Sequence, residues 1–133
     1  MKKKVCIVIS TYNEDVTSKL YLSAKKELYK YKLKKIHVIK VPGAFEIPVT
    51  ISRIASKYDG FIAIGCIVKG ETANFDLISK AITDGIMQLS INKRKPIGNS
   101  ILTLFNKKQA FKRIKQGKEA AQAIYKVLKE NNY

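Results

Sequence analysis

The chain has 133 residues, of which 26 are basic and 10 are acidic, so its formal charge is +16. A hydrophobic fraction of 46% excludes global disorder, because disordered chains combine high charge with few apolar residues. No apolar run reaches the roughly 20 residues that span a bilayer or resembles a signal peptide, so we expect one cytoplasmic domain over residues 1–133.

Four short apolar runs, rich in β-branched residues, predict strands; the first is expected to be buried on both faces, and the third is the most apolar. They cover residues 4–10, 35–41, 61–68 and 101–104.

The segments between these runs carry apolar residues at helical spacing, with charged residues on the other side. They predict helices from Val16 to Tyr31, over 47–58, over 75–92, and over 107–130 with a break near Gly117.

Strands that alternate with helices indicate right-handed crossovers and a parallel sheet covered on both faces. The sequence therefore predicts a three-layer α/β/α sandwich of the flavodoxin-like type, with a four-stranded parallel sheet. Ligands bind such sheets beyond the carboxyl ends of the strands. The loops at 10–15, 42–46, 66–74 and 104–106 are thus the places to look for a site.

The basic residues are 23 Lys and three Arg, and the Lys residues are spread along the chain. Lys lacks the planar fork with which Arg reads phosphates and guanine, so we do not expect a dedicated nucleic-acid role. A field of this sign still attracts polyanions and small anionic substrates. Abundant Lys, Ile and Asn are equally consistent with a biased coding composition.

Metal and nucleotide signatures are absent from the sequence. The single His, His37, falls within a predicted strand, and Cys6 and Cys66 lie in separate apolar runs. We expect both cysteines to be free core thiols in a reducing compartment. One His within a strand and two cysteines 60 residues apart predict no metal site. Neither a Walker loop nor a GxGxxG fingerprint occurs.

The predicted loops hold polar and aromatic residues, each with two interpretations. Tyr12 either stacks on a planar ligand or covers the edge of the core. Glu46 either contacts a ligand or complements the dipole at a helix start. Gly70 and Thr72 either present N–H groups to a phosphate or form an ordinary polar loop.

Four segments together resemble the 6,7-dimethyl-8-ribityllumazine synthase family, the riboflavin synthase beta-subunit family. They are TYNEDVTSKL (11–20), VPGAFEIP (41–48), GCIVKGETANFD (65–76) and KPIGNSILT (95–103). The resemblance runs from about residue 4 to 128 and implies a step of riboflavin biosynthesis. In that step 5-amino-6-(D-ribitylamino)uracil condenses with 3,4-dihydroxy-2-butanone 4-phosphate, releasing phosphate and water, without metal or redox cofactor.

The resemblance also implies site residues. Pyrimidine and ribityl contacts are expected from Tyr12, Ala44, Phe45, Glu46, Cys66, Ile67, Val68 and Asn99. The phosphate is expected at Glu71, Thr72, Arg113 and Lys118. Tyr12 would stack on the pyrimidine, Cys66–Val68 would contribute backbone contacts, and a neighbouring subunit would contribute Asn99.

The sequence departs from the family at one important position. The family's catalytic histidine falls at position 74, which is Asn here. Histidine donates and accepts protons near neutral pH, whereas an Asn side chain cannot titrate. We expect a working but slower enzyme in which water, Lys69 or Glu71 replaces the histidine. The alternative is a degenerate member that binds a pyrimidine or flavin without turnover.

The resemblance further implies a homo-oligomer with active sites between subunits. Family members form pentamers and sometimes sixty-subunit capsids, and riboflavin synthase is a candidate partner. The segment ahead of residue 4 and the segment between Arg113 and Gly117 are shorter than in the family. We therefore expect at least a pentamer and leave the capsid open. No membrane partner is expected.

Overall fold

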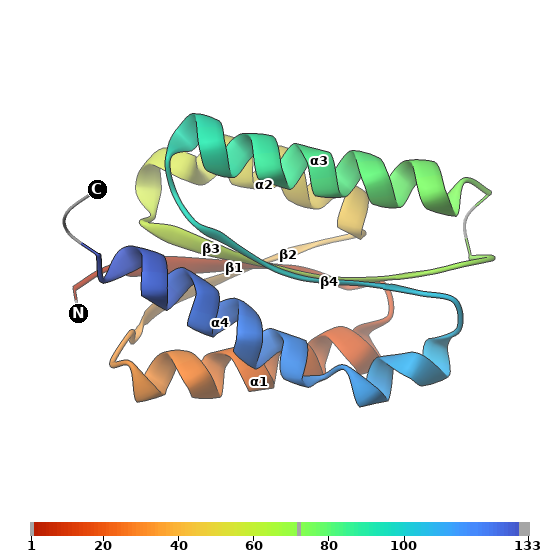
Figure 1. Cartoon of the computed structure of the whole chain (residues 1–133), viewed down its shortest axis with the longest axis horizontal. Helices are drawn as coiled ribbons and strands as arrows, with labels where there is room; N and C mark the ends of the chain where they lie inside the picture. The colour runs from red at the N-terminus through yellow and green to blue at the C-terminus, as the bar shows by residue number, and fades with distance from the viewer. Residues whose placement is uncertain (1, 72, 131–133) are drawn as a thin grey trace.

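Four parallel strands form one sheet in the computed structural model, which describes residues 2–71 and 73–130 (Figure 1). The strands are β1 (Lys4–Ser10), β2 (Lys35–Val41), β3 (Gly60–Val68) and β4 (Ile97–Leu104). Their order in the sheet is β2-β1-β3-β4. The chain adds strands first on one side of β1 and then on the other, which confirms the predicted flavodoxin-like topology.

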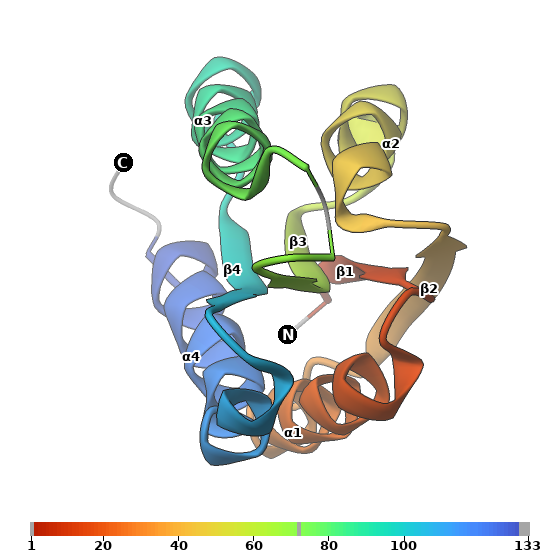
Figure 2. The ribbon, with the colours of Figure 1, turned by 90° about the vertical axis from the view of Figure 1, so that its right-hand side faces the viewer.

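Two pairs of helices cover the two faces of the sheet (Figure 2). The helices α1 (Glu14–Lys30) and α4 (Lys115–Leu128) pack on one face, and α2 (Ile47–Ile54) and α3 (Phe75–Lys93) cover the other. Alternate residues of β1 and β3 supply the two separate hydrophobic cores. The described residues contain no helix that is both long and apolar enough to cross a bilayer.

The predicted boundaries were least accurate in the last third of the chain. The strand predicted to begin at residue 101 begins at Ile97, because Gly98 and Asn99 hide its apolar pattern. The segment 107–130 is two elements, the 3-10 helix η3 (Lys107–Lys112) and α4. The break therefore lies before Lys115, and the expectation of a break near Gly117 was wrong.

Gly117 lies inside α4 because two helices approach each other closely there. A Cβ atom at this position would overlap the carbonyl oxygen of Leu20 and lie 3.2 Å from the backbone nitrogen of Ala24. Both are backbone atoms of α1, so neither can move without shifting the helix. The glycine is thus required by packing and does not terminate the helix.

Replacing Gly117 with alanine is expected to lower the free energy of unfolding by about 1–3 kcal/mol, the usual cost of overpacking a core. Gly85, inside α3, is the matched control, since a Cβ there would lie at an ordinary 3.5 Å from the Pro48 side chain. Gly85→Ala should be neutral or stabilise by up to about 1 kcal/mol, because alanine favours helix. Urea unfolding followed by circular dichroism measures both. Equal midpoints for the two variants would contradict the packing argument.

Candidate functional site

The loops after β1 and β2 are tied together at the carboxyl edge of the sheet. The backbone N–H of Thr11 donates to the carbonyl oxygen of Val41 at 2.8 Å, and that of Tyr12 donates to Pro42 at 3.1 Å. These bonds fix where the Tyr12 ring leaves the backbone, next to the 3-10 helix η1 (Ala44–Glu46).

Asn13 joins the first loop to the loop after β3. Its backbone adopts a left-handed conformation, with φ 60° and ψ 47°, which asparagine tolerates better than most residues. Its side-chain Nδ2 lies 3.2 Å from the Cys66 carbonyl oxygen and 3.2 Å from the Glu71 carboxylate. One amide therefore holds both a backbone carbonyl and a carboxylate at the same edge.

A groove of about 180 Å³ lies where these three loops meet, on the α2–α3 face of the sheet. Its lining consists of Tyr12, Gly43, Ala44, Phe45, Cys66, Ile67, Val68, Glu71, Ile78 and Ile82. Seven of these are residues that the sequence predicted for the site: Tyr12, Ala44, Phe45, Cys66, Ile67, Val68 and Glu71. The structure therefore brings these seven residues together at the carboxyl ends of the strands, and their role in binding stays a prediction.

The groove suits a flat ring with polar edges. The residues Tyr12 and Phe45 are 55% and 60% exposed, so both present an aromatic side chain to solvent. Ile78 and Ile82 of α3 contribute apolar wall, while Glu71 is a charged group at the groove. The sequence interpretation missed this role of Ile78 and Ile82, because a helical apolar stripe indicates core and does not show which of its residues border a ligand.

The Cys66 thiol is not a nucleophile in this setting. Burial is the main cause that raises its pKa to about 11, and the negative charge of Glu71 adds to the effect. The thiol is therefore protonated at neutral pH and acts as a small apolar side chain. Cys66 therefore contributes its backbone to the groove, and its thiol takes no part in the chemistry.

Glu46 lies beside the groove without lining it. Its Oε1 accepts a hydrogen bond from the Gly43 backbone N–H at 3.0 Å, and its carbonyl oxygen accepts one from the Thr50 hydroxyl at 2.8 Å. The carboxylate thus caps η1 in the way expected of an acidic residue at a helix start. Its contact with a ribityl chain remains a prediction.

Three other predicted residues lie outside the groove of their own chain. Asn99 is exposed on the edge strand β4, opposite Ala63, whereas Cys66 pairs with Leu102 three residues further on. Arg113 follows η3 and is exposed. The backbone N–H of Lys118 donates to the Ser23 hydroxyl of α1 at 3.0 Å, on the opposite face of the sheet.

Asn74 precedes α3, and its carbonyl oxygen accepts a hydrogen bond from the backbone N–H of Ile78 at 2.9 Å. It lines a hollow of about 430 Å³ next to the groove, formed by residues of the same loop and the start of α3. Lys69 borders this hollow too, and its ammonium lies over the Phe105 ring at 5.4 Å. Thr72 is outside the described residues.

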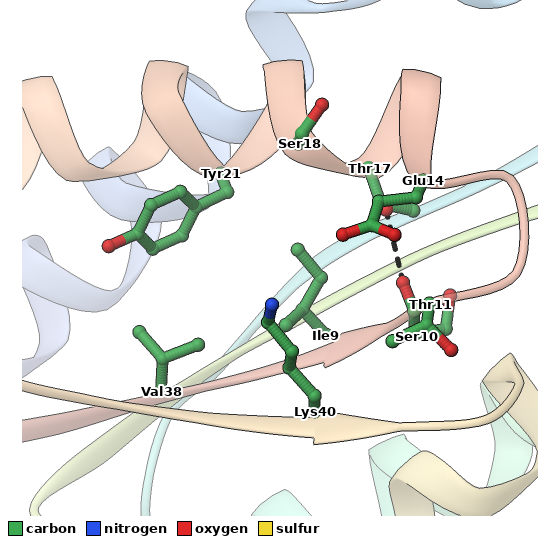
Figure 3. Close-up of a pocket in the computed structure, with 9 residues that line it drawn as sticks. All are labelled: Ile9, Ser10, Thr11, Glu14, Thr17, Ser18, Tyr21, Val38 and Lys40. Atoms are coloured by element: carbon green, nitrogen blue, oxygen red, sulfur yellow. Dashed lines mark hydrogen bonds between the residues drawn. The ribbon is translucent and has the colours of Figure 1, made fainter.

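A further hollow, of about 330 Å³, lies between α1 and the β1–β2 part of the sheet (Figure 3). In it the Thr17 hydroxyl donates to the Ser10 carbonyl oxygen at 3.0 Å, and Tyr21 and Lys40 face each other across the opening. No residue predicted for the site lines this hollow. Although this hollow is larger than the groove at the carboxyl edge, its size alone does not make it the functional site.

Among residues 2–71 and 73–130, no three His, Cys, Asp or Glu side chains group closely enough to hold a metal ion. His37 lies on β2, with its Nδ1 2.7 Å from the Tyr58 hydroxyl, as expected of a structural strand residue.

Comparison with known sequences decides the family. The model of the 6,7-dimethyl-8-ribityllumazine synthase family matches residues 2–132. The chain belongs to this family. The lumazine synthases of Limosilactobacillus reuteri and Polaromonas are both 39% identical to it, over 89% and 90% of the chain and 80% and 81% of their own length. That of Pyrococcus furiosus is 32% identical over 83% of the chain and 71% of its length.

Membership confirms the resemblance drawn from the four sequence segments. The chain therefore has the lumazine synthase activity of riboflavin biosynthesis.

Proposed function

We propose that the groove at the carboxyl edge binds 5-amino-6-(D-ribitylamino)uracil and condenses it with 3,4-dihydroxy-2-butanone 4-phosphate. The observation that carries this proposal is the meeting of seven predicted residues, from three segments far apart in sequence, in one groove. In this arrangement Tyr12 and Phe45 stack on the pyrimidine and the backbone of Cys66–Val68 runs along its polar edge.

The condensation consists of imine formation with loss of water, loss of phosphate, and ring closure with loss of a second water. Two reactants that are held together in the right orientation can react as if each met the other at an effective concentration of roughly 10⁵–10⁸ M. Positioning therefore carries much of the catalysis. Proton transfer to and from the reacting amine and carbonyl typically adds about 10²–10⁴-fold. The shape of the groove supplies the positioning. Proton transfer needs a titratable group in addition.

Glu71 is that group in our proposal. Asn74 cannot carry a proton, and the Lys69 ammonium lies over the Phe105 ring. Glu71 lines the groove itself, and Asn13 orients its carboxylate at 3.2 Å. A carboxylate suits proton exchange better than contact with a phosphate dianion, which carries charge of the same sign. We therefore assign the phosphate to Arg113, Lys118 and Thr72.

Glu71→Gln should lower kcat for lumazine formation by about 10–100-fold with little change in KM, because the amide cannot exchange a proton. Gln keeps an oxygen that accepts the hydrogen bond from Asn13, so the loop connection is retained. Asp76→Asn is the control, since this exposed carboxylate lies in the first turn of α3, just after the loop that holds Glu71, and borders the neighbouring hollow. Steady-state kinetics of both variants test the assignment. Equal kcat in Glu71→Gln and the parent would show that another group or water carries the proton.

The active site is completed, in our proposal, by a second copy of the chain. Asn99, Arg113 and Lys118 do not reach the groove of their own chain, yet the chemistry requires a phosphate clamp. We propose that each domain, residues 1–133, receives these side chains from its neighbour in a homopentamer. A sixty-subunit capsid and an association with riboflavin synthase would extend the same assembly.

The cytoplasm is the location that we propose for the protein, because the free cysteines, Cys6 and Cys66, stay reduced in that compartment.

A binding protein without turnover is the second candidate. The observation in its favour is Asn74, which removes the family's proton carrier while the groove is retained. Both candidates predict pyrimidine binding, so only turnover separates them.

A further inference from the structure

The parallel topology brings the segments before the four strands and the carboxyl ends of the helices to one end of the molecule (left side of Figure 1). Lys4 and Lys35 are direct partners in the sheet, and the Phe61 N–H donates to the Pro96 carbonyl oxygen at 3.0 Å. We call this end the amino pole and define it as residues 2–4, 30–35, 55–59, 92–96 and 126–130. The catalytic groove lies at the opposite end of the strands.

Basic residues concentrate at the amino pole. It holds thirteen of the 26 basic residues and two of the ten acidic ones, so its formal charge is +11. The basic side chains are exposed, apart from the half-buried Lys95. The remainder of the chain carries the other thirteen basic residues but eight acidic ones. Charges that are scattered in sequence are thus gathered by the fold.

Nearby groups of opposite sign do not neutralise this charge. The Asp59 carboxylate accepts a hydrogen bond from the Lys4 backbone N–H at 2.7 Å. Glu27, one turn before the pole, is buried and faces Lys30 at 3.5 Å. Helix carboxyl ends attract cations, but four helix dipoles supply only about −2 in total. Helix capping therefore explains only a small part of the basic charge.

The pole also contains a polar hollow. Its volume is about 370 Å³, and its lining is Ser52, Ala55, Ser56, Asn92, Lys93 and Lys95. The Lys95 ammonium donates to the Ala55 carbonyl oxygen at 2.6 Å, which fixes one charge at the wall. Hydroxyl, amide and ammonium donors together are the groups that contact phosphate oxygens in nucleic-acid complexes.

The gathering of these lysines by the fold changes the expectation drawn from the sequence, and we propose that the amino pole binds the phosphate backbone of duplex nucleic acid without sequence preference. Lys is a point charge that suits phosphates and reads no bases bidentately, and Arg94 is the single Arg in the pole. Among the described residues of the pole, Val127, at 40% exposure, is the only exposed large apolar side chain. A protein interface needs an apolar centre, and firm membrane anchoring needs an apolar insertion besides basic charge. The duplex backbone, with about one charge per 1.7 Å, needs neither.

The test is binding of a labelled 20-base-pair DNA of random sequence, measured by fluorescence anisotropy between 50 and 200 mM salt. The pole variant replaces Lys3, Lys34 and Lys57 with Gln. The control replaces Lys19, Lys108 and Lys112 with Gln, which removes equal charge from exposed positions outside the pole. The pole variant should lose about 10–100-fold in affinity, and its salt slope should fall by about 2–3. The control should lose much less.

Lumazine formation by the pole variant should equal that of the parent, so failure of this proposal is distinguishable from failure of the proposed function. Equal losses of DNA affinity in the pole variant and the control would overturn the proposal, because the charge would then act diffusely. Tighter binding to polyglutamate or to vesicles with 30% phosphatidylserine than to the DNA would overturn it too. Those results would identify an acidic protein or a membrane as the partner.

Discussion

Replacing Asn74 with histidine is expected to raise kcat for lumazine formation by about 10–100-fold, the part of the usual 10²–10⁴-fold acid–base contribution that Glu71 does not supply. The position precedes α3, whose amino end carries a partial positive charge. That charge disfavours the imidazolium and keeps a histidine there neutral at pH 7. The kcat of the variant should change with pH between about pH 5.5 and 7, a dependence that the parent lacks.

Asn74→Gln is the matched control, because it changes length without adding a titratable group. Its kcat should stay within a few-fold of the parent. Stopped-flow absorbance of both variants across pH 5 to 9 gives the comparison. An Asn74→His variant no faster than the parent would show that the chain has replaced the histidine fully, or that position 74 does not meet the reacting atoms.

Mixing two impaired variants should restore activity if the site is shared between copies. Tyr12→Ala removes one of the two stacking rings of the groove. Arg113→Ala removes the arginine of the phosphate site and should lower kcat/KM by about 10–100-fold. In a ring assembled from equal amounts, about a quarter of the sites would combine an intact groove with an intact neighbouring Arg113. Co-refolded mixtures should therefore recover about a quarter of the parent rate.

The control mixture pairs Arg113→Ala with the double variant Tyr12→Ala/Arg113→Ala, in which no copy offers the arginine. It should recover nothing beyond the residual rate of its components. If the first mixture also stays at that level, Arg113 serves the groove of its own chain or none. The proposal of a shared site would then be abandoned.

The fold was predictable because the local patterns are strong. The buried strands at 4–10 and 61–68 appear as apolar runs. The strand at 35–41 is an edge strand and mostly exposed, but it is still rich in β-branched residues, and alternation with helices fixes a parallel sheet. Glycine made the predicted element boundaries inaccurate in two places. Gly98 hid the start of β4, and Gly117 looked like a helix break, whereas it allows α1 and α4 to pack closely. Sequence patterns do not show which helices come into contact.

The site was predictable to the extent that it depends on loops after strands. Tyr12, Phe45 and Glu71 meet in the groove because parallel strands end at one edge. The double contact of Asn13 with two distant groups leaves no local pattern in the sequence. Charge at the amino pole was missed for a similar reason, because lysines far apart in sequence become neighbours only after folding.

The most direct test of this account is lumazine formation by the unmodified chain, from the two purified substrates, followed by absorbance against a protein-free blank. We expect a rate clearly above the blank and well below that of Asn74→His. A rate equal to the blank, with the pyrimidine still bound, would contradict the account. It would show that the groove has kept its ligand and lost its chemistry.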